Sequence, residues 1–309
     1  MKKISELINL ENKVALITGG SRGLGFQFAE ALGELGAKVV ITARKEHELS
    51  DAKNKLSKQS IDCETFTNDL QNFDQIPELI KKILDKFSKI DILVNNAGAA
   101  WGAPAENHPD EAWDKVMNLN LNSVFRLSKE VAVSSMIPNQ YGKIINIASM
   151  AGIATGLGSI QEVGYTASKH GVVSFTRSFG TSKPNVYHSE GIKAYAICPF
   201  FADTNLVKES ININDLTKRI KTRVLTVEEV GHAMEMSLKN DENGACWVVF
   251  PDCPPFVMPD VNLNLCKAMI GFGQKIAGPM SWETFNGKHF FAFVFIFLAC
   301  FYYFLGFFF

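Results

Sequence analysis

Seven short apolar runs rich in β-branched residues recur along the chain, and longer segments with helical periodicity separate them. Strands that alternate with helices predict a parallel sheet, because each crossover returns the chain to the same edge of the sheet. Parallel strands are buried on both faces, which explains why these runs are almost continuously apolar. We therefore expect an α/β fold with a doubly wound, parallel, seven-stranded sheet. The expected strands are residues 13–18, 38–43, 63–67, 91–96, 143–149, 192–198 and 245–250.

The chain contains no internal repeat and no low-complexity linker, so residues 1–250 predict one large domain. Residues 204–226 are polar with a helical tendency, and we expect a mobile flap between the sixth and seventh strands. Residues 251–288 are rich in Pro, Gly and Asn and predict a connector to a distinct C-terminal segment, 289–309.

Composition excludes several classes of function. Lys and Arg (31) nearly balance Asp and Glu (32), so no field favours nucleic acid. The six cysteines lack C-x-x-C spacing, which argues against a structural zinc site or a disulfide framework, and we expect no metal. The N-terminal "MKKISELINLENK" has no apolar core typical of a secretory signal. A reducing, cytosolic location is therefore expected for the folded domain. The cysteines are Cys63, Cys198, Cys246, Cys253, Cys266 and Cys300.

A glycine-rich loop, "TGGSRGLG" from Thr18 to Gly25, joins the first expected strand directly to a helical pattern. Glycines allow a tight turn from strand to helix and let a pyrophosphate approach the positive helix N-terminus. A tight turn without a ligand is the simpler interpretation of such glycines alone. The order of strand, loop and helix favours a dinucleotide site instead.

The end of the second expected strand distinguishes the two nicotinamide dinucleotides. An NAD site needs a carboxylate there for the ribose 2′-hydroxyl, whereas an NADP site needs cations for the 2′-phosphate. In "VVITARKEHEL" the expected acid is replaced by Ala43, followed by Arg44 and Lys45, and Arg22 lies in the glycine loop. Although such charges are often only solvated, the absence of the acid favours NADP(H) over NAD(H).

Tyr165 is followed four residues later by Lys169 in "YTASK", which puts the phenol and the ammonium group on one helix face. A phenol titrates near ~10, so it exchanges protons at neutral pH only where a cation favours the phenolate. Tyr165 is thus a candidate general acid/base. In isolation this spacing is more often an amphipathic helix with a snorkelling Lys.

Three further polar features support the catalytic interpretation. "NNAG", residues 95–98, ends the fourth expected strand, where a parallel sheet holds its ligands. Ser149 ends the fifth, and its hydroxyl could bind a substrate oxygen. Asn120 lies on an expected helix that could reach the same centre, although alone it would be interpreted as a packing residue.

With these motifs, residues 8–250 resemble the short-chain dehydrogenase/reductase family. The resemblance implies a Rossmann fold that binds NAD(P)(H), and a tetrad at Asn120, Ser149, Tyr165 and Lys169. It assigns the adenine contact to Asp69 and the carboxamide contact to Thr204. The expected cofactor-binding residues are Thr18, Gly19, Ser21, Arg22, Gly23, Leu24, Gly25, Arg44, Asp69, Leu70, Asn96, Gly98, Tyr165, Lys169, Pro199 and Thr204.

The resemblance also implies a mechanism. NADPH would deliver hydride to a carbonyl while Tyr165 donates the proton and Ser149 steadies the oxyanion. Lys169 would bind the nicotinamide ribose and lower the Tyr165 pKa, and Asn120 would hold a water that relays protons to Lys169. A homodimer or homotetramer is implied, with the helices of Asn120 and Tyr165 near the interface.

The sequence indicates the substrate less clearly than it indicates the cofactor and the catalytic residues. The first half resembles 3-oxoacyl-carrier-protein reductases, whereas the later part is similar to NAD-using 15-hydroxyprostaglandin dehydrogenases. Phe200 replaces a Gly of the family, which is expected to narrow the pocket or strain the loop, and the stretch 150–164 is longer than usual. Trp101, Phe200 and Phe201 could line an apolar pocket.

We favour reduction of a lipid-like or acyl carbonyl. NAD-dependent alcohol oxidation is the alternative, and a catalytically silent cofactor-binding scaffold at a membrane is the alternative of another class. No Ser-His-Asp order supports a hydrolase.

The C-terminal segment is unlike the rest of the chain. Residues 290–309 carry no charge, and ten of the twenty are Phe. A helix of this length would span about 30 Å, which matches the hydrocarbon layer of a membrane. We expect residues 289–309 to form a membrane anchor, with Lys288 at its border and the enzyme on the cytosolic side. A helix packed in an oligomer, a spurious terminal exon and a soluble cytoplasmic protein are the alternatives.

Overall fold

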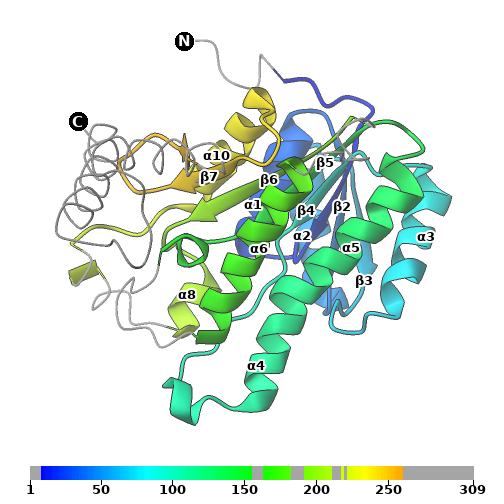
Figure 1. The fold of residues 1–309 in the computed structure, drawn as a ribbon. Helices are drawn as coiled ribbons and strands as arrows, with labels where there is room; N and C mark the ends of the chain where they lie inside the picture. The colour runs from blue at the N-terminus through cyan, green and yellow to red at the C-terminus, as the bar shows by residue number, and fades with distance from the viewer. Residues whose placement is uncertain (1–7, 155–162, 182–190, 211–216, 219–220, 260–309) are drawn as a thin grey trace, which may run out of the picture. The chain divides into compact units, whose positions relative to one another are not determined.

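The computed structural model describes residues 8–154, 163–181, 191–210, 217–218 and 221–259. Its centre is a twisted sheet of eight strands (Figure 1). Seven of them coincide with the seven expected runs, so the predicted parallel α/β architecture is confirmed. The strands are β1 (Val14–Thr18), β2 (Lys38–Ala43), β3 (Cys63–Thr67), β4 (Ile92–Asn95), β5 (Gly142–Ile147), β6 (Ile192–Pro199), β7 (Cys246–Val249) and β8 (Phe256–Val257).

The strand order is β3-β2-β1-β4-β5-β6-β7-β8, and β1 to β7 are all parallel. Ile17 of β1 lies between Ile41 of β2 and Val94 of β4. The chain therefore winds outward in opposite directions from β1 and β4. Such a reversal leaves a crevice at the carboxyl ends of the two strands, which is where ligands bind in sheets of this kind.

The prediction of seven strands was incomplete, because β8 pairs antiparallel with β7 in the segment expected to be a connector. Trp247 pairs with Val257, and the Met258 N–H donates to the Cys246 carbonyl at 2.8 Å. A turn at Pro251 and Asp252 reverses the chain, and Asp252 has a φ of 59°. A strand of two residues is too short to show alternation in sequence, so no pattern could reveal it.

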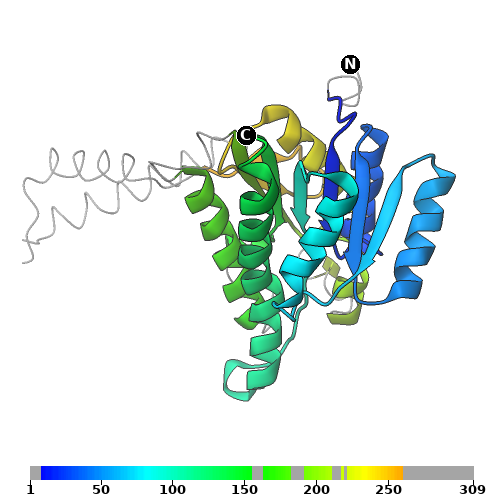
Figure 2. The ribbon, with the colours of Figure 1, turned by 90° about the vertical axis from the view of Figure 1, so that its right-hand side faces the viewer.

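Helices cover both faces of the sheet (Figures 1 and 2). One face packs against α1, α2 and α10, and the other against α3, α5 and α6. The principal helices are α1 (Gly23–Glu34), α2 (Glu46–Lys58), α3 (Gln75–Phe87), α4 (Asp110–Met117), α5 (Ser123–Val131), α6 (Val163–Thr181), α8 (Asn205–Ser210) and α10 (Val227–Asn240), with short 3₁₀ or π turns at η2 (Ala105–Asn107), η3 (Asn118–Asn122), η4 (Ala132–Met136) and η5 (Met150–Gly152).

The two-residue period of the strands divides the core between these faces. Ile17 and Ile41 pack on the side of α1, whereas Leu16 and Val40 pack on the side of α3. On α3 the buried positions Ile76, Leu79, Ile80 and Ile83 follow helical spacing. Each such side chain contributes about 1.5–3 kcal/mol when fully buried, so this packing fixes the carboxyl edge of the sheet in place.

Several expectations fall on residues that the structure does not describe. The long stretch before Tyr165 includes residues 155–162, and the expected anchor at 289–309 also lies outside the described residues, as does most of the connector. Of the expected flap, 204–226, the structure describes residues 204–210, which include α8, and residues 217–218 and 221–226. Within the described part of the chain, no helix is both long enough and apolar enough to cross a membrane.

Candidate active site

A cleft of about 610 Å³ opens at the carboxyl edge of the sheet. Its walls come from the glycine loop, the ends of β2 and β4, the residues after β3, β5 and β6, and one face of α6. These segments are distant in sequence but meet because parallel strands end at the same edge. Most of the predicted site residues line this cleft: Gly19, Ser21, Arg22, Gly23, Leu24, Arg44, Asp69, Leu70, Asn96, Gly98, Ser149, Tyr165, Lys169, Pro199 and Thr204.

The glycine loop has the geometry of a phosphate cradle. Gly19 and Gly23 have φ values of 63° and 57°, in the left-handed region that favours glycine. A Cβ on Gly25 would lie 2.2 Å from the Gly19 carbonyl oxygen, so only glycine lets α1 begin this close to β1. The loop ends at the N-terminus of α1, whose free N–H groups favour an anion. Gly25 itself does not line the cleft and acts through packing.

Thr18 also lies outside the cleft wall and joins two strands. Its Oγ1 accepts hydrogen bonds from the backbone N–H groups of Asn96 (2.9 Å) and Ala97 (3.0 Å) and donates to the Val94 carbonyl (3.3 Å). The Asn96 side chain returns a bond to the Thr18 carbonyl at 2.8 Å. The predicted cofactor residue Thr18 therefore positions the loop after β4.

The residues after β3 form one end of the cleft. Asp69 Oδ1 accepts from the Gln71 N–H at 3.0 Å, and Leu70 is buried beside it. The adjacent Asn68 was not predicted; its Oδ1 is buried and has no hydrogen-bond partner in the described structure. Asn68 directly follows a parallel strand, much as Asn95 ends one, and that analogy could have identified it. An unpaired acceptor here fits a ligand with an amino group, such as adenine.

Cations gather at the end of β2, as expected for NADP(H). Arg22, Ala43, Arg44 and Lys45 all line the cleft, and Ala43 leaves the usual acidic position without a charge. Sequence analysis missed Glu48, which lines the cleft from the first turn of α2. The cradle, the unpaired Asn68 acceptor and these cations together fit a phosphorylated dinucleotide.

The predicted catalytic residues Ser149, Tyr165 and Lys169 all line the cleft. Lys169 is 5% exposed, and its Nζ donates to the Ile147 carbonyl at 2.6 Å. The same Nζ lies 5.6 Å from the centre of the Tyr165 ring, which the four-residue spacing on α6 brings about. Burial lowers the pKa of Lys169 to about 8, against a weaker opposing influence of Cys198.

Ser149 follows β5 and begins the short 3₁₀ turn η5. Its Oγ accepts from the Ala151 N–H at 3.1 Å, and this bond restricts the rotamer of Ser149, which lines the cleft. The hydroxyl proton remains available to a ligand oxygen. Ser149 and Tyr165 both line the cleft, and the catalytic role expected for them stays a prediction.

Asn120 is buried but does not line the cleft. Its side-chain amide forms a two-way pair with the Ala99 backbone, at 2.8 Å in each direction, and donates to Ser168 Oγ at 3.1 Å. Both amide hydrogens are thus used inside the protein. The π turn η3 around Asn120 interrupts the run from α4 to α5, and such turns often occur at functional sites.

Below the cleft, a buried chain of hydrogen bonds joins the sheet to the helices. Asn95 Nδ2 donates to Ser128 Oγ (2.9 Å) and to Asn146 Oδ1 (2.8 Å). Asn146 Nδ2 donates to Thr176 Oγ1 at 2.9 Å. Ser128 is on α5 and Thr176 is on α6, so this polar ladder links β4 and β5 to both helices. Sequence analysis did not predict it.

The loop after β6 carries an unusual aromatic group. Phe200 lines the cleft and stacks on Phe250, with ring centres 4.5 Å apart. Phe200 does not have a positive φ, so the expected strain at this position is absent. Trp101 is 47% exposed, and neither it nor Phe201 lines the cleft. Of the three aromatic residues expected to line an apolar pocket, only Phe200 does so.

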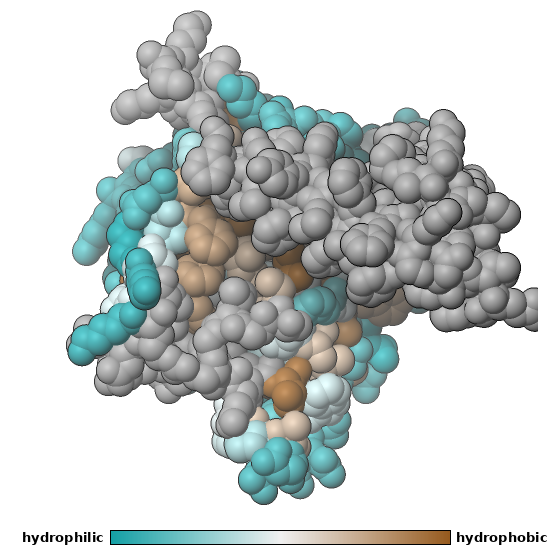
Figure 3. All heavy atoms as spheres, turned by 60° about the vertical axis from the view of Figure 1, so that its left-hand side comes forward, coloured by the Kyte–Doolittle hydropathy of each residue, from teal (hydrophilic) through white to brown (hydrophobic). Residues whose placement is uncertain are grey.

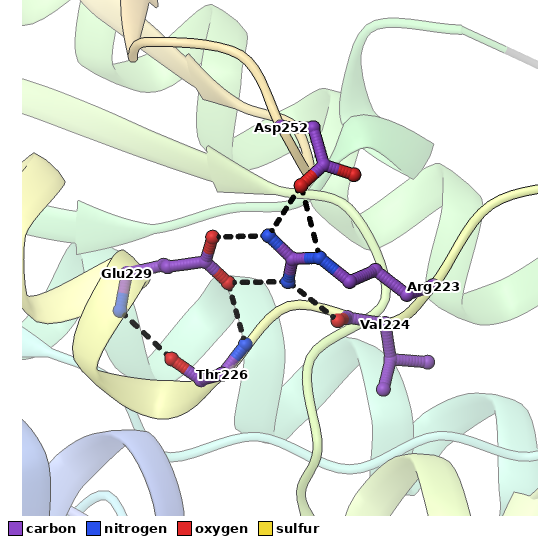
Figure 4. Close-up of polar contacts among 5 residues, drawn as sticks. All are labelled: Arg223, Val224, Thr226, Glu229 and Asp252. Atoms are coloured by element: carbon purple, nitrogen blue, oxygen red, sulfur yellow. Dashed lines mark hydrogen bonds and ion pairs between the residues drawn. The ribbon is translucent and has the colours of Figure 1, made fainter.

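An ion-pair cluster anchors this loop from outside the cleft (Figure 4). Arg223 Nη1 and Nη2 donate to the two carboxylate oxygens of Glu229 at 2.8 and 2.7 Å, and Nε and Nη2 both reach Asp252 Oδ1. Glu229 also accepts from the Thr226 N–H in a capping box that starts α10. The cluster joins the turn before β8 to the start of α10.

Backbone hydrogen bonds of Leu225, two residues after Arg223, connect the ion-pair cluster to the cleft wall. The Leu225 N–H donates to the Phe201 carbonyl at 2.8 Å, and the Asp203 N–H donates to the Leu225 carbonyl at 2.9 Å. Asp203 and Thr204 line the cleft, and a Cβ on Gly23 would lie 3.6 Å from the Thr204 side chain. The position of Thr204 beside the glycine loop is therefore fixed by this pairing.

Among the described residues no group of His, Cys, Asp and Glu could hold a metal ion, and Cys63, Cys198, Cys246 and Cys253 form no disulfide bond there. Figure 3 shows hydrophobic side chains of described residues at the surface, with hydrophilic ones beside them. Exposed apolar side chains of this kind are compatible with an apolar ligand or partner.

Residues 13–214 match the family model for short chain dehydrogenases. The chain belongs to this family. The predicted resemblance is thereby confirmed, together with the Rossmann-type fold and the expectation of a dehydrogenase or reductase that acts on CH–OH and C=O groups. The matched residues include the glycine loop, Ser149, Tyr165 and Lys169.

Named relatives of this short-chain dehydrogenase include reductases and dehydrogenases. The 3-oxoacyl-acyl-carrier-protein reductase FabG of Vibrio cholerae is 37% identical over 201 residues, which cover 65% of this chain and 78% of that protein. A solved gluconate 5-dehydrogenase from Burkholderia cenocepacia, in complex with NADP and tartrate, has a TM-score of 0.71 and 27% identity, covering 78% of this chain and 94% of its own. A variant actinorhodin polyketide ketoreductase solved with NADPH has a TM-score of 0.69 and 28% identity, covering 78% and 96%.

Proposed function

We propose that this short-chain dehydrogenase is an NADP(H)-dependent oxidoreductase that interconverts a carbonyl and a secondary alcohol on a lipid-like or acyl substrate. The observation that carries the proposal is the placement of Ser149, Tyr165 and Lys169 in the same cleft as the glycine cradle and the cations after β2. The solved ketoreductase with NADPH and the dehydrogenase with NADP support the choice of cofactor. When bound, NADPH supplies the hydride.

Tyr165 is the general acid in the direction of reduction and the general base in oxidation. Its phenol faces the cleft, and the Lys169 ammonium group 5.6 Å from the ring centre favours the phenolate by charge attraction. The Ser149 hydroxyl donates a hydrogen bond to the substrate oxygen and so stabilises the negative charge that develops there. Lys169 has a second role, in holding the nicotinamide ribose.

Asn120 supports this arrangement without contact to the cleft. Its bonds to Ala99 and Ser168 hold the segment after β4 against α6, which carries Tyr165. If a water bound at Asn120 relays protons, it must contact the backbone of Asn120 or its side-chain Oδ1. Both hydrogens of the side-chain amide are already donated within the protein.

An apolar or acyl substrate is favoured by Phe200 and Leu206, two apolar residues that line the cleft together with Ser149. The relatives named as ketoacyl reductases support an acyl substrate. The gluconate dehydrogenase among the relatives favours a polyhydroxy acid as the second candidate.

A cofactor and substrate panel tests this function. Purified enzyme should oxidise NADPH with a 3-oxoacyl thioester, and more slowly with a keto-gluconate, and should prefer NADPH to NADH. A preference of about tenfold or more for NADH would favour the NAD-dependent alcohol oxidation instead. Tight NADPH binding without turnover of any carbonyl or alcohol would support the silent cofactor-binding scaffold.

Assembly and location are further proposals that rest on sequence. We expect a homodimer or homotetramer formed through the helices near Asn120 and Tyr165, which light scattering can measure. The charge-free residues 290–309 are proposed to hold the enzyme at a membrane with the catalytic domain in the cytosol. Apolar carbonyl substrates concentrate at such a surface.

A further inference from the structure

Glu48 lies where the glycine loop meets the start of α2, and the proposed cofactor site does not account for it. Its Oε2 accepts a hydrogen bond from Ser21 Oγ at 3.3 Å, across 27 residues of sequence. Its Oε1 forms an ion pair with Lys45 Nζ at 2.8 Å. The Glu48 side chain is 25% exposed and lines the cleft with both partners.

A glutamate in the first turn of a helix is common, because the helix dipole favours negative charge there. That effect explains the residue type but does not explain a contact with the glycine loop. Glu46 shares the first turn of α2 with Glu48 and therefore feels the same dipole. It is exposed and does not line the cleft. The contact between the loop and α2 is therefore specific to Glu48.

The partners of Glu48 are the groups that a 2′-phosphate would use. Ser21 and Lys45 donate to Glu48, and the hydrogen bond from Lys45, together with the nearby charge of Arg22, holds the pKa of the Glu48 carboxyl below its ordinary value. A phosphate in this part of the cleft would have to compete with the carboxylate for these donors and would be repelled by its charge. A 2′-hydroxyl, in contrast, could donate to the carboxylate.

We propose that Glu48 sets the balance between the two nicotinamide dinucleotides, by opposing the 2′-phosphate of NADP(H) and offering an acceptor to the 2′-hydroxyl of NAD(H). This specificity role rests on the proposed cofactor site. It assigns the acidic function that is missing at Ala43 to a residue in the first turn of α2. The enzyme then retains usable affinity for NAD(H) despite its cations.

Equilibrium binding of cofactor fragments tests this role without catalysis. Adenosine 2′,5′-bisphosphate carries the 2′-phosphate, and AMP carries the free 2′-hydroxyl. In Glu48→Gln, the ratio of the two affinities should shift toward the bisphosphate by about fivefold to tenfold, as expected for removal of one like charge at a few ångströms in a partly solvated site. NADPH and NADH should show the same shift by fluorescence titration.

The matched control is Glu46→Gln, which removes the same charge from the same helix turn outside the cleft. An equal shift in both variants, or none in Glu48→Gln, would overturn the role of Glu48 while leaving the cofactor site standing. If the wild-type enzyme binds neither fragment and neither dinucleotide, the proposed function fails first, and the role of Glu48 fails with it.

Discussion

The Nζ atom of Lys169 donates to the carbonyl oxygen of Ile147 at 2.6 Å, and this bond holds a buried ammonium group beside the phenol of Tyr165. Burial removes most of the water that would hydrate this ammonium group, and the Ile147 carbonyl replaces only part of that hydration. The pKa of Lys169 falls to about 8 for that reason. The charge state of Lys169 is therefore sensitive to pH in the range where enzymes are usually assayed.

The affinity for NADPH is expected to fall as the pH rises from 7 to 9.5, because Lys169 loses its proton around pH 8. Fluorescence titrations at several pH values measure this affinity. The Lys169→Met variant should bind NADPH more weakly throughout and should lack the decline. An identical pH dependence in that variant would remove Lys169 as its origin.

The lowered pKa of Lys169 also predicts the direction in which the free energy of unfolding changes with pH. Because its pKa of about 8 in the folded state lies below its ordinary value of 10.5, the unfolded chain binds more protons between these pH values. The contribution of Lys169 to the free energy of unfolding should therefore rise from pH 8 to 10.5. Denaturant unfolding of the wild type and of Lys169→Met, compared across this range, isolates the contribution.

Replacement of Tyr165 by Phe should reduce kcat by about 100-fold or more, since the only catalytic group removed is the proton donor. The dissociation constant for NADPH should remain nearly unchanged. Tyr141→Phe is a matched control, because it removes a phenolic hydroxyl at a position that does not line the cleft. Wild-type turnover in Tyr165→Phe would discard the assignment of Tyr165.

Replacement of Asn146 by Ala should destabilise the protein by about 2–4 kcal/mol, because it leaves a buried Asn95 donor without its partner and opens a small cavity. Denaturant unfolding monitored by circular dichroism measures the loss. Asn122→Ala breaks an exposed bond between two asparagines, Asn122 and Asn118, and should cost far less. Equal losses in the two variants would contradict the importance given to burial.

The anchor of the loop after β6 predicts an effect on binding. Arg223→Gln should raise the dissociation constant for NADPH by less than about tenfold, because exposed ion pairs are individually weak. Arg223→Lys should not restore the affinity, since a single ammonium cannot bind two carboxylates as the planar guanidinium does. Lys81→Gln, which breaks an exposed pair with Asp85 on α3, should leave binding unchanged. Unaltered binding in Arg223→Gln would show that the loop does not depend on this anchor.

Deletion of residues 289–309 should release an active enzyme into the soluble fraction. The reason is that the charge-free run 290–309 is the proposed membrane segment. Fractionation with and without detergent measures the change. Full-length protein that is soluble and monodisperse without detergent would contradict the anchor.

The sequence predicted the sheet well, because strands buried on both faces show continuous apolar runs. It predicted the meeting of Tyr165 and Lys169, because a spacing of four residues fixes neighbours on a helix. Ser149 lines the cleft because the ends of parallel strands share an edge. All three predictions depend on local periodicity or on one topological rule.

The sequence could not predict contacts that depend on how separate elements pack. The bond between Glu48 and Ser21 depends on the direction of α2, and the inward pairing of Asn120 with Ala99 depends on the π turn. The strand β8 was not predicted, because two residues are too few to show an alternating pattern in the sequence. The polar ladder was missed because Asn146 lies in an otherwise apolar strand, where sequence gives no sign of its partners on two helices.

The polar ladder has a consequence for how such an enzyme can diversify. If α6 slid by one turn, Asn146 would face Val172 or Gly180 instead of Thr176, and neither has a hydroxyl. Only one axial register of α6 therefore satisfies the ladder, and Tyr165 stands three turns from the residue that enforces it. The position of the Tyr165 phenol along the helix axis therefore depends on an uncharged hydrogen bond in the interior, between Asn146 and Thr176. Loops around the cleft can consequently exchange residues, as at Phe200, and admit new substrates while the proton donor stays where it was.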